Sequence, residues 1–131
     1  MKDLRGLRVL AVDDDPFVRD LTRGLLRDLH VADIETACDG NEALAILDKF
    51  ANAPHVILCD LSMPGMTGWQ LARAVKVSCP SLVTGIITGW GEHAEAKPDE
   101  RAWVDFMLSK PISQEALRRE LAHARLRRRC A

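Results

Sequence analysis

The sequence lacks several features that mark common functional classes. It has no Tyr, three Trp and three Phe, which are too few for an aromatic platform that stacks nucleic-acid bases. Its 18 basic and 19 acidic residues give a net charge of -1, so no basic excess points to nucleic acid. No apolar run approaches the roughly 18 residues that a membrane span requires. We expect a protein that binds no nucleic acid directly and is not inserted in a membrane.

Cysteine motifs and a targeting signal are also missing. The four cysteines, at positions 38, 59, 79 and 130, never form a CxxC pair, so neither a zinc site nor a disulfide framework is indicated. We expect the first three to be buried or half-buried thiols and Cys130 to be exposed. The amino terminus meets charged residues at once and has no apolar segment of a secretory signal, which favours the cytoplasm. A length of 131 residues is typical of one domain.

What the sequence does have is an alternation of short apolar runs and amphipathic segments. The apolar runs predict buried strands at 7–12, 34–37, 55–60, 82–88 and 104–108. Three- and four-residue spacing predicts helices between them, and the first carries Phe17, Leu21, Leu25, Leu26 and Leu29 along an apolar stripe. Glycines and a proline in 89–103 allow only a short helix around 99–102. The alternation predicts a parallel sheet with helices on both faces.

Polar residues follow four of the predicted strands: Asp13, Asp14 and Asp15, then Asp60, Thr88 and Lys110. Ligands of such sheets bind at the carboxyl ends of the strands. Carboxylates that converge there repel one another unless a cation joins them, and Mg²⁺ prefers oxygen ligands. Beside a metal held by Asp13 and Asp14, Asp60 could attack phosphorus while Thr88 and Lys110 match the phosphoryl charge. Each residue alone has a structural explanation, but their joint placement favours a phosphoryl-transfer site.

Four motifs in this order make the sequence resemble the receiver domains of two-component response regulators. They are VDDDP at 12–16, LCDLSMPGMTG at 58–68, ITG at 87–89 and LSKPI at 108–112. The resemblance implies a flavodoxin-like (βα)5 fold of the α/β class, a doubly wound parallel five-stranded sheet in the order 2-1-3-4-5. It covers 7–126, so we expect 1–131 to be a single receiver domain with no effector domain in this chain. The TGWG string at 88–91 is more similar to receivers of hybrid sensor histidine kinases.

The resemblance also implies a role for each site residue. Asp60 would be the phosphoacceptor, and the cofactor would be Mg²⁺, with Mn²⁺ as a substitute. Asp60, Asp14, the backbone carbonyl of Ser62 and, largely through bound water, Asp13 would hold the metal. Thr88 and Lys110 would contact the phosphoryl oxygens. Asp15 is expected to play a secondary role and not to be a ligand, and the peptide bond after Lys110 resembles the family's cis bond.

The function implied by the resemblance is that of a phosphoacceptor in a two-component phosphorelay. The donor would be a sensor histidine kinase or a histidine phosphotransfer protein, and phosphorylation would alter an output face that could mediate homodimerisation. The chain would catalyse only its own phosphorylation and dephosphorylation and so is not expected to be an enzyme. One alternative is a small phosphatase that works through an aspartyl phosphate, although Ser62 stands where a general acid is needed. The other is a phosphate-independent, pseudo-receiver interaction module, although every core residue is present.

Three departures from the family pattern carry further expectations. Met107 stands where the family has an aromatic switch residue, and Phe106 should point to the opposite face of the sheet. Neither Ser62 nor Trp90 can position an attacking water as a carboxylate or amide would, so we expect a long-lived phosphorylated state. We expect Trp103, like Trp90, to cover a core edge. The basic run at 125–129 is expected to be a solvated helix end.

Overall fold

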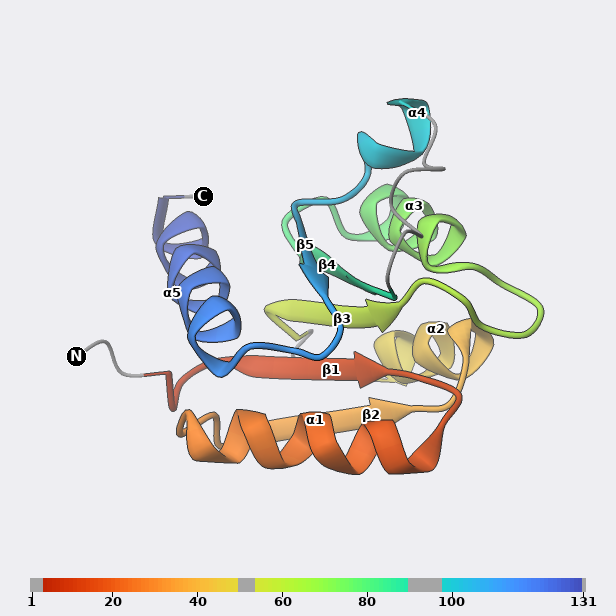
Figure 1. The fold of residues 1–131 in the computed structure, drawn as a ribbon. Helices are drawn as coiled ribbons and strands as arrows, with labels where there is room; N and C mark the ends of the chain where they lie inside the picture. Colours follow the sequence, from red (N-terminus) through yellow and green to blue (C-terminus); the bar gives the residue numbers. More distant parts are fainter. Residues whose placement is uncertain (1–3, 50–53, 90–97, 131) are drawn as a thin grey trace.

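The structure is a computed structural model that describes residues 4–49, 54–89 and 98–130 (Figure 1). The strands are β1 (Arg8–Val12), β2 (Asp33–Ala37), β3 (Val56–Asp60), β4 (Val83–Thr88) and β5 (Phe106–Ser109). The helices are α1 (Pro16–Asp28), α2 (Gly40–Lys49), α3 (Gly68–Ser78), α4 (Pro98–Arg101) and α5 (Gln114–Cys130). The predicted alternation of strands and helices is confirmed.

The five strands form one parallel sheet in the order β2-β1-β3-β4-β5, as the resemblance implied. The strand order reverses between β1 and β3, which pair side by side with Val12 opposite Cys59. In open α/β sheets the crevice beyond such a reversal is the usual ligand site. The residues that follow Val12 and Cys59, which are Asp13 and Asp60, therefore enter this crevice together.

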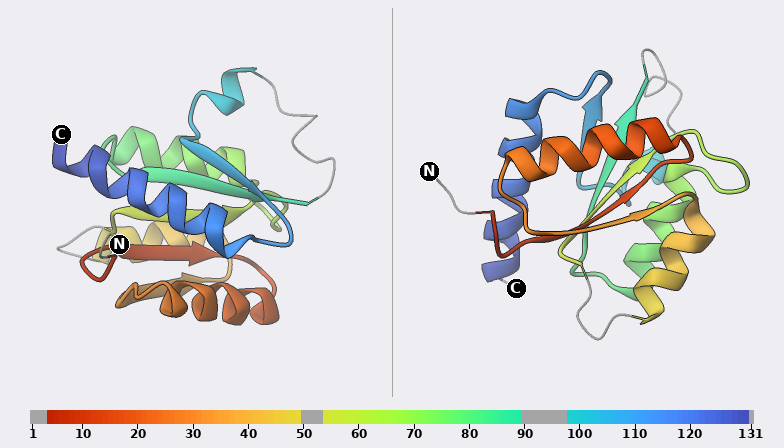
Figure 2. Two further views of the ribbon diagram at one scale, coloured as in Figure 1. Left: turned by 60° about the vertical axis from the view of Figure 1, so that its left-hand side comes forward. Right: turned by 90° about the horizontal axis from the view of Figure 1, so that it is seen from below.

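Helices cover both faces of the sheet, with α1 and α5 on one side and α2 and α3 on the other (Figure 2). Successive strand residues enter different cores, because side chains alternate along a strand. Val9 and Leu58 pack with Leu117 of α5, whereas Leu10 and Ile57 pack on the α2–α3 side. β3 is buried along its whole length, which explains why its sequence is an unbroken apolar run.

The apolar stripe of α1 is wider than the face that the sheet covers. Phe17 is 69% exposed and Leu21 is 55% exposed, whereas Thr22 and Leu26 are buried. The helix predicted from this spacing is present, but the side chains of Phe17 and Leu21 do not enter the core. Their four-residue spacing is helical, but it traces a line beside the one through Thr22 and Leu26, and Thr22 occupies a core position that an apolar pattern overlooks.

Local signals explain where the helices begin. The side chain of Asp15 accepts a hydrogen bond of 2.9 Å from the N–H of Phe17 and caps α1. Thr67 and Gln70 form a capping box at the start of α3. Ser113 Oγ accepts from the N–H of Ala116 at 3.2 Å, which confirms the predicted cap of α5.

The segment before β5 differs from the expectation in its boundary. Helix α4 has four residues, so the predicted short fourth helix is confirmed. The strand was expected to begin at Val104, but the N–H of Val104 bonds to the carbonyl of Arg101 in a turn, and β5 begins at Phe106. Trp103, in this turn, is half-buried, as expected. Trp90, for which the same was expected, lies outside the described residues.

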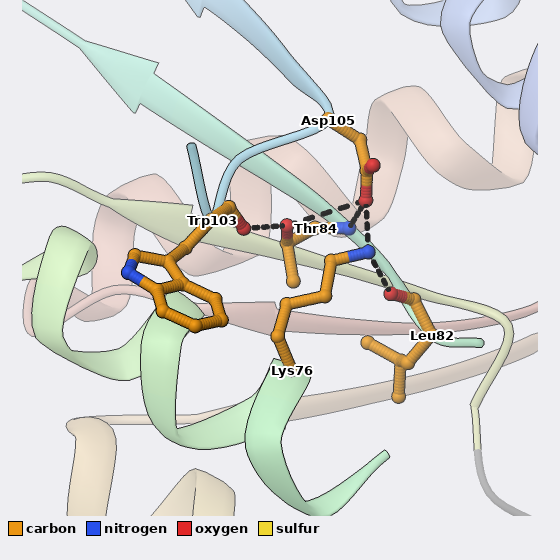
Figure 3. A network of polar contacts seen from close by, with 5 residues as sticks. All are labelled: Lys76, Leu82, Thr84, Trp103 and Asp105. Atoms are coloured by element: carbon orange, nitrogen blue, oxygen red, sulfur yellow. Dashed lines mark hydrogen bonds and ion pairs between the residues drawn. The ribbon is translucent and has the colours of Figure 1, made fainter. Parts of the chain in front are cut away.

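A polar network at the amino-terminal edge of the sheet joins α3, β4 and the start of β5 (Figure 3). Asp105 Oδ2 lies 2.6 Å from Lys76 Nζ and accepts from the N–H of Thr84 at 2.8 Å. Lys76 also donates to the carbonyl of Leu82, and the hydroxyl of Thr84 donates to the carbonyl of Trp103, each at 2.8 Å. These contacts fix the turn before β5 against α3. Among the described residues, no helix is both long and apolar enough to cross a membrane.

Candidate functional site

Three of the predicted acidic residues converge at the carboxyl edge of the sheet. Asp13 and Asp14 follow β1 and Asp60 ends β3. Each offers a carboxylate oxygen, and these oxygens all lie within 4.8 Å of one another. Asp13 and Asp60 are buried, with 6% and 5% of their surface exposed, whereas Asp14 is exposed. The cluster is therefore open to solvent on the side of Asp14.

Hydrogen bonds from side chains and the main chain hold the connection between β1 and α1. Asp13 Oδ1 accepts from the N–H of Asp15 at 2.9 Å. The N–H of Asp13 donates to the carbonyl of Ala37, and the guanidinium of Arg19 donates to the carbonyl of Asp13 at 2.6 Å. The side chain of Asp15 caps α1, which agrees with the expectation that it is not a ligand.

Lys110 supplies the positive charge at this edge. Its Nζ lies 2.8 Å from Asp60 Oδ1. Its N–H donates to the carbonyl of Thr88 at 2.8 Å, and the Lys110–Pro111 peptide bond is cis, as the resemblance implied. Thr88 is the last residue of β4 and is 1% exposed. The structure thus brings Asp60, Thr88 and Lys110 to the same edge from three neighbouring strands.

The connection from β3 to α3 passes close to the cluster and depends on a glycine. Ser62, whose backbone carbonyl is the remaining predicted ligand, is exposed two residues beyond Asp60. The N–H of Gly68 donates to the carbonyl of Leu61 at 2.8 Å. A Cβ atom on Gly68 would lie 2.7 Å from the backbone oxygen of Asp60. The start of α3 can approach the acidic strand end this closely because residue 68 has no side chain.

The electrostatics of the cluster favour a bound cation. The pKa of Asp13 is raised chiefly by burial and further by the charges of Asp60 and Asp14, against the hydrogen bond from Asp15 and the charge of Lys110. Three carboxylates face one ammonium that pairs with them, which leaves an excess of negative charge. All the side-chain donors are oxygens, the type that Mg²⁺ and Mn²⁺ prefer. These residues fit a hard divalent cation.

The cysteines are poor candidates for the chemistry. Burial, and then the charge of Asp60, raise the pKa of Cys59 to about 12, so its thiol stays protonated. The pKa of Cys38 is also raised, by desolvation and by Asp39 and Glu42. Cys38 and Cys79 are half-buried and Cys59 is buried, as expected, and all three are free thiols. The side chain of Cys130 lies outside the described part of the chain. Asp60 is therefore a better nucleophile candidate than its neighbour Cys59.

Two features of the site were not found from the sequence. The first is a groove of about 520 Å³ between α1 and the β5–α5 connection, which reaches from the exposed Leu21 to Lys110 and Pro111. The wide apolar stripe on α1 was a signal for this groove. A helix that packs against one face of a sheet needs fewer apolar residues than α1 has. The second is the contact between Arg19 and the carbonyl of Asp13, which no sequence pattern signals.

Residues of β5 confirm the expected split between the two faces. Phe106 packs in the core on the α1–α5 side, whereas Met107 packs against the core on the α2–α3 side. The ring of Phe106 occupies the space where a side chain of Gly85 would be, since a Cβ there would lie 2.3 Å from the ring. Met107 pairs with Ile86, two residues before Thr88. Met107 therefore lies on the same side of the sheet as Ile86 and Thr88.

Comparisons with known proteins agree with this geometry. Residues 9–122 match the model of a family described as the response regulator receiver domain. The chain is 33% identical over 116 residues to the sensor histidine kinase RcsC of Salmonella typhi, and the match covers 88% of this chain and 12% of that protein. It is 29% identical over 113 residues to the transcriptional regulatory protein YesN of Bacillus subtilis, over 84% of this chain and 30% of YesN. The chain thus spans less than a third of either relative.

A solved structure shows the same fold. The receiver domain protein of Clostridium thermocellum superimposes with a TM-score of 0.87 at 24% identity, and the match covers 95% of this chain and 98% of that one. Agreement over nearly the whole of both chains means that the five-stranded core has no large insertion relative to that domain.

Proposed function

The chain belongs to the response regulator receiver domain family, and from this premise we propose that Asp60 accepts a phosphoryl group in a Mg²⁺-dependent reaction. The donor is a phosphohistidine of a sensor histidine kinase or a histidine phosphotransfer protein. Receiver domains act in two-component signalling with partners of these classes. The chain acts only on itself in this proposal, in phosphorylation and dephosphorylation, and turns over no separate substrate.

The convergence of three carboxylates on one another, with Lys110 2.8 Å from Asp60, is the observation that carries the proposal. An oxygen of Asp60 attacks phosphorus, the bond between phosphorus and the donor's imidazole nitrogen breaks, and its electron pair stays on that nitrogen. Bound Mg²⁺, held by Asp13, Asp14, Asp60 and the carbonyl of Ser62, would offset the negative charge of the phosphoryl oxygens.

The other two side chains of the proposal, Lys110 and Thr88, act on the phosphoryl oxygens. Lys110 exchanges its ion pair with Asp60 for the new phosphoryl group, which carries more charge than the carboxylate it replaces. Thr88 is buried at the end of β4, and its hydroxyl donates to a phosphoryl oxygen in the product. The change at Thr88 then reaches Met107 and the output face formed by α4, β5 and α5. That face could also mediate homodimerisation.

The groove beside α1 is where the donor protein is proposed to dock. Phe17 and Leu21 expose apolar surface on α1, and the groove next to Leu21 extends to Lys110. Contiguous exposed apolar surface usually marks an interface. A partner that covers this surface would bring its histidine to the open side of the acidic cluster.

We also propose a cytoplasmic location and a long-lived phosphorylated state. Acyl-phosphate hydrolysis needs a positioned water, and the exposed residue two positions after Asp60 is Ser62, which has no carboxylate or amide. A half-life of minutes or longer for the phosphorylated protein would support this part of the proposal, whereas a half-life of seconds would refute it.

Incubation with acetyl phosphate and Mg²⁺ followed by measurement of the intact mass tests the proposed reaction. We expect a gain of one phosphoryl group, about 80 Da, that is absent in Asp60→Asn and in the presence of EDTA. No gain in the wild type under any condition would contradict the proposal and favour the phosphate-independent interaction module. Turnover of p-nitrophenyl phosphate would instead indicate the phosphatase.

A further inference from the structure

We propose that Arg19 is a positioning residue for the metal site. Its guanidinium holds the backbone between β1 and α1 so that the carboxylates of Asp13 and Asp14 stay directed toward Asp60. The inference rests on the proposed function, because it concerns the affinity of the same acidic cluster for Mg²⁺. Arg19 is not itself a predicted metal ligand, and it lies outside the motifs at the strand ends.

The contact is specific in position. Arg19 lies in the first turns of α1 and is half-buried. Its Nη1 donates to the main-chain carbonyl of Asp13 at 2.6 Å, and its own N–H donates to the carbonyl of Asp15 at 3.0 Å. Arg19 therefore contacts both ends of the short connection that carries the acidic pair.

The carbonyl of Asp13 belongs to the planar peptide group that joins Asp13 to Asp14. Its orientation therefore sets the position of the backbone nitrogen of Asp14. The N–H of Asp13 is already held by the carbonyl of Ala37 at 3.1 Å. With Arg19 on the carbonyl, Asp13 is held through its main chain on both sides. Asp14 is the exposed member of the cluster, and it would otherwise be the carboxylate most readily displaced by repulsion from the two buried ones.

The chemistry of the guanidinium suits this task. A hydrogen bond from a charged donor is stronger than one between neutral groups. The contact uses the main-chain carbonyl oxygen, so Arg19 occupies no carboxylate oxygen of Asp13. Lysine cannot reproduce the rigid planar fork.

Arg23 provides a matched control on the same helix. It is half-buried like Arg19, and its Nη2 donates to Thr36 Oγ1 of β2 at 3.1 Å. Its Nη1 lies 3.6 Å from Asp20 Oδ1. Replacement of Arg23 by Met removes an equal charge and a contact between α1 and a strand, but touches nothing in the connection that carries Asp13 and Asp14.

The test compares the Mg²⁺ dissociation constants of wild type, Arg19→Met, Arg19→Lys and Arg23→Met by titration calorimetry with MgCl₂. Residues that orient metal ligands typically contribute about 10- to 100-fold to metal affinity. We expect Arg19→Met to bind Mg²⁺ about tenfold more weakly, Arg19→Lys to lie in between, and Arg23→Met to stay within twofold of wild type. Thermal unfolding in EDTA checks that each variant is folded.

A second readout separates a positioning role from general damage. The rate of phosphorylation by acetyl phosphate in Arg19→Met should return to near the wild-type value when Mg²⁺ is raised to saturation. Wild-type Mg²⁺ affinity in Arg19→Met, or an equal loss in Arg23→Met, would overturn the inference. Failure of the proposed function looks different, because then the wild type itself binds no Mg²⁺, and both ideas are refuted.

Discussion

Two edges of the same sheet carry buried or half-buried carboxylates in opposite circumstances. At the amino-terminal edge, Asp105 Oδ2 has donors from two elements: Lys76 Nζ at 2.6 Å, and the N–H and hydroxyl of Thr84 at 2.8 and 3.4 Å. At the carboxyl-terminal edge, three carboxylates share the charge of Lys110. The first arrangement is balanced within the chain, and the second has an excess of negative charge.

The difference shows how one type of side chain performs two tasks. Asp105 ties β5 to α3 and β4, and a bound ion would add nothing to a charge that Lys76 already balances (Figure 3). The carboxylates around Asp60 are close enough to repel one another, so the metal-free protein keeps them together at a cost in stability. Excess charge at a solvent-open sheet edge is therefore the mark of the functional cluster.

Lys110→Met is expected to produce the largest change. Removal of a positioned cation or donor from a developing negative charge typically lowers rates by about 100- to 1000-fold. Phosphorylation by acetyl phosphate should slow by about 100-fold, while Mg²⁺ affinity should not weaken, because the variant loses a competing positive charge. The rate of mass gain at saturating Mg²⁺ measures the effect. A rate within fivefold of wild type would show that Lys110 serves only the fold.

Asp105→Asn should destabilise the protein without touching the chemistry. The amide cannot replace the ion pair with Lys76, and it places an NH₂ group among donors, so we expect a loss of about 2 kcal/mol in the free energy of unfolding. Urea denaturation in EDTA measures it. Mg²⁺ affinity should stay within twofold of wild type. Weakened Mg²⁺ binding in this variant would mean that the two edges are coupled, and would contradict a purely structural role for Asp105.

Asp13→Asn should raise the stability of the metal-free protein and weaken Mg²⁺ binding, in contrast to Asp105→Asn. Loss of one buried charge relieves repulsion from Asp60 and Asp14, and Asn can still accept the hydrogen bond from Asp15, so we expect a gain of about 1 kcal/mol in stability without metal. Mg²⁺ binding should weaken sharply. Urea denaturation in EDTA and Mg²⁺ titration check the two effects. A variant less stable than wild type in EDTA would contradict the repulsion argument.

The difference in stability between Asp13→Asn and wild type depends on pH. The pKa of Asp13 is raised in the folded state, so the folded protein binds more protons than the unfolded chain between the ordinary and the raised pKa. Protonation therefore favours the folded state, and the advantage of Asp13→Asn over wild type should shrink as pH falls through the raised pKa. Paired denaturation curves in EDTA at several pH values measure this difference.

Much of the site could be predicted because parallel topology fixes where strand ends meet. Once the apolar runs ending at Val12 and Asp60 are read as neighbouring strands, the acids that end them must share an edge. The motifs around Thr88 and Lys110 extend the same reasoning to β4 and β5. The residues that meet at this edge can be predicted without knowledge of side-chain conformations, so the sequence was enough to identify them.

The remaining features depend on how elements pack, which local patterns do not record. Helical spacing placed Phe17 and Leu21 on an apolar stripe, but the side of α1 that meets the sheet is set by the tertiary fold and includes Thr22. The pairing of Lys76 with Asp105 joins residues 29 positions apart and follows from the seating of α3 on β4. Arg19 binds a main-chain carbonyl, and such a partner carries no sequence signature.

Chemical trapping of an aspartyl phosphate tests whether the acidic cluster makes Asp60 a cation-dependent phosphoacceptor. Protein treated with acetyl phosphate and Mg²⁺ is reduced with borohydride, which converts an aspartyl phosphate to homoserine, and is then mapped by peptide mass spectrometry. We expect homoserine at position 60 that depends on Mg²⁺ and is absent in EDTA. Unmodified Asp60, or trapping at another carboxylate with Asp60 intact, would contradict it.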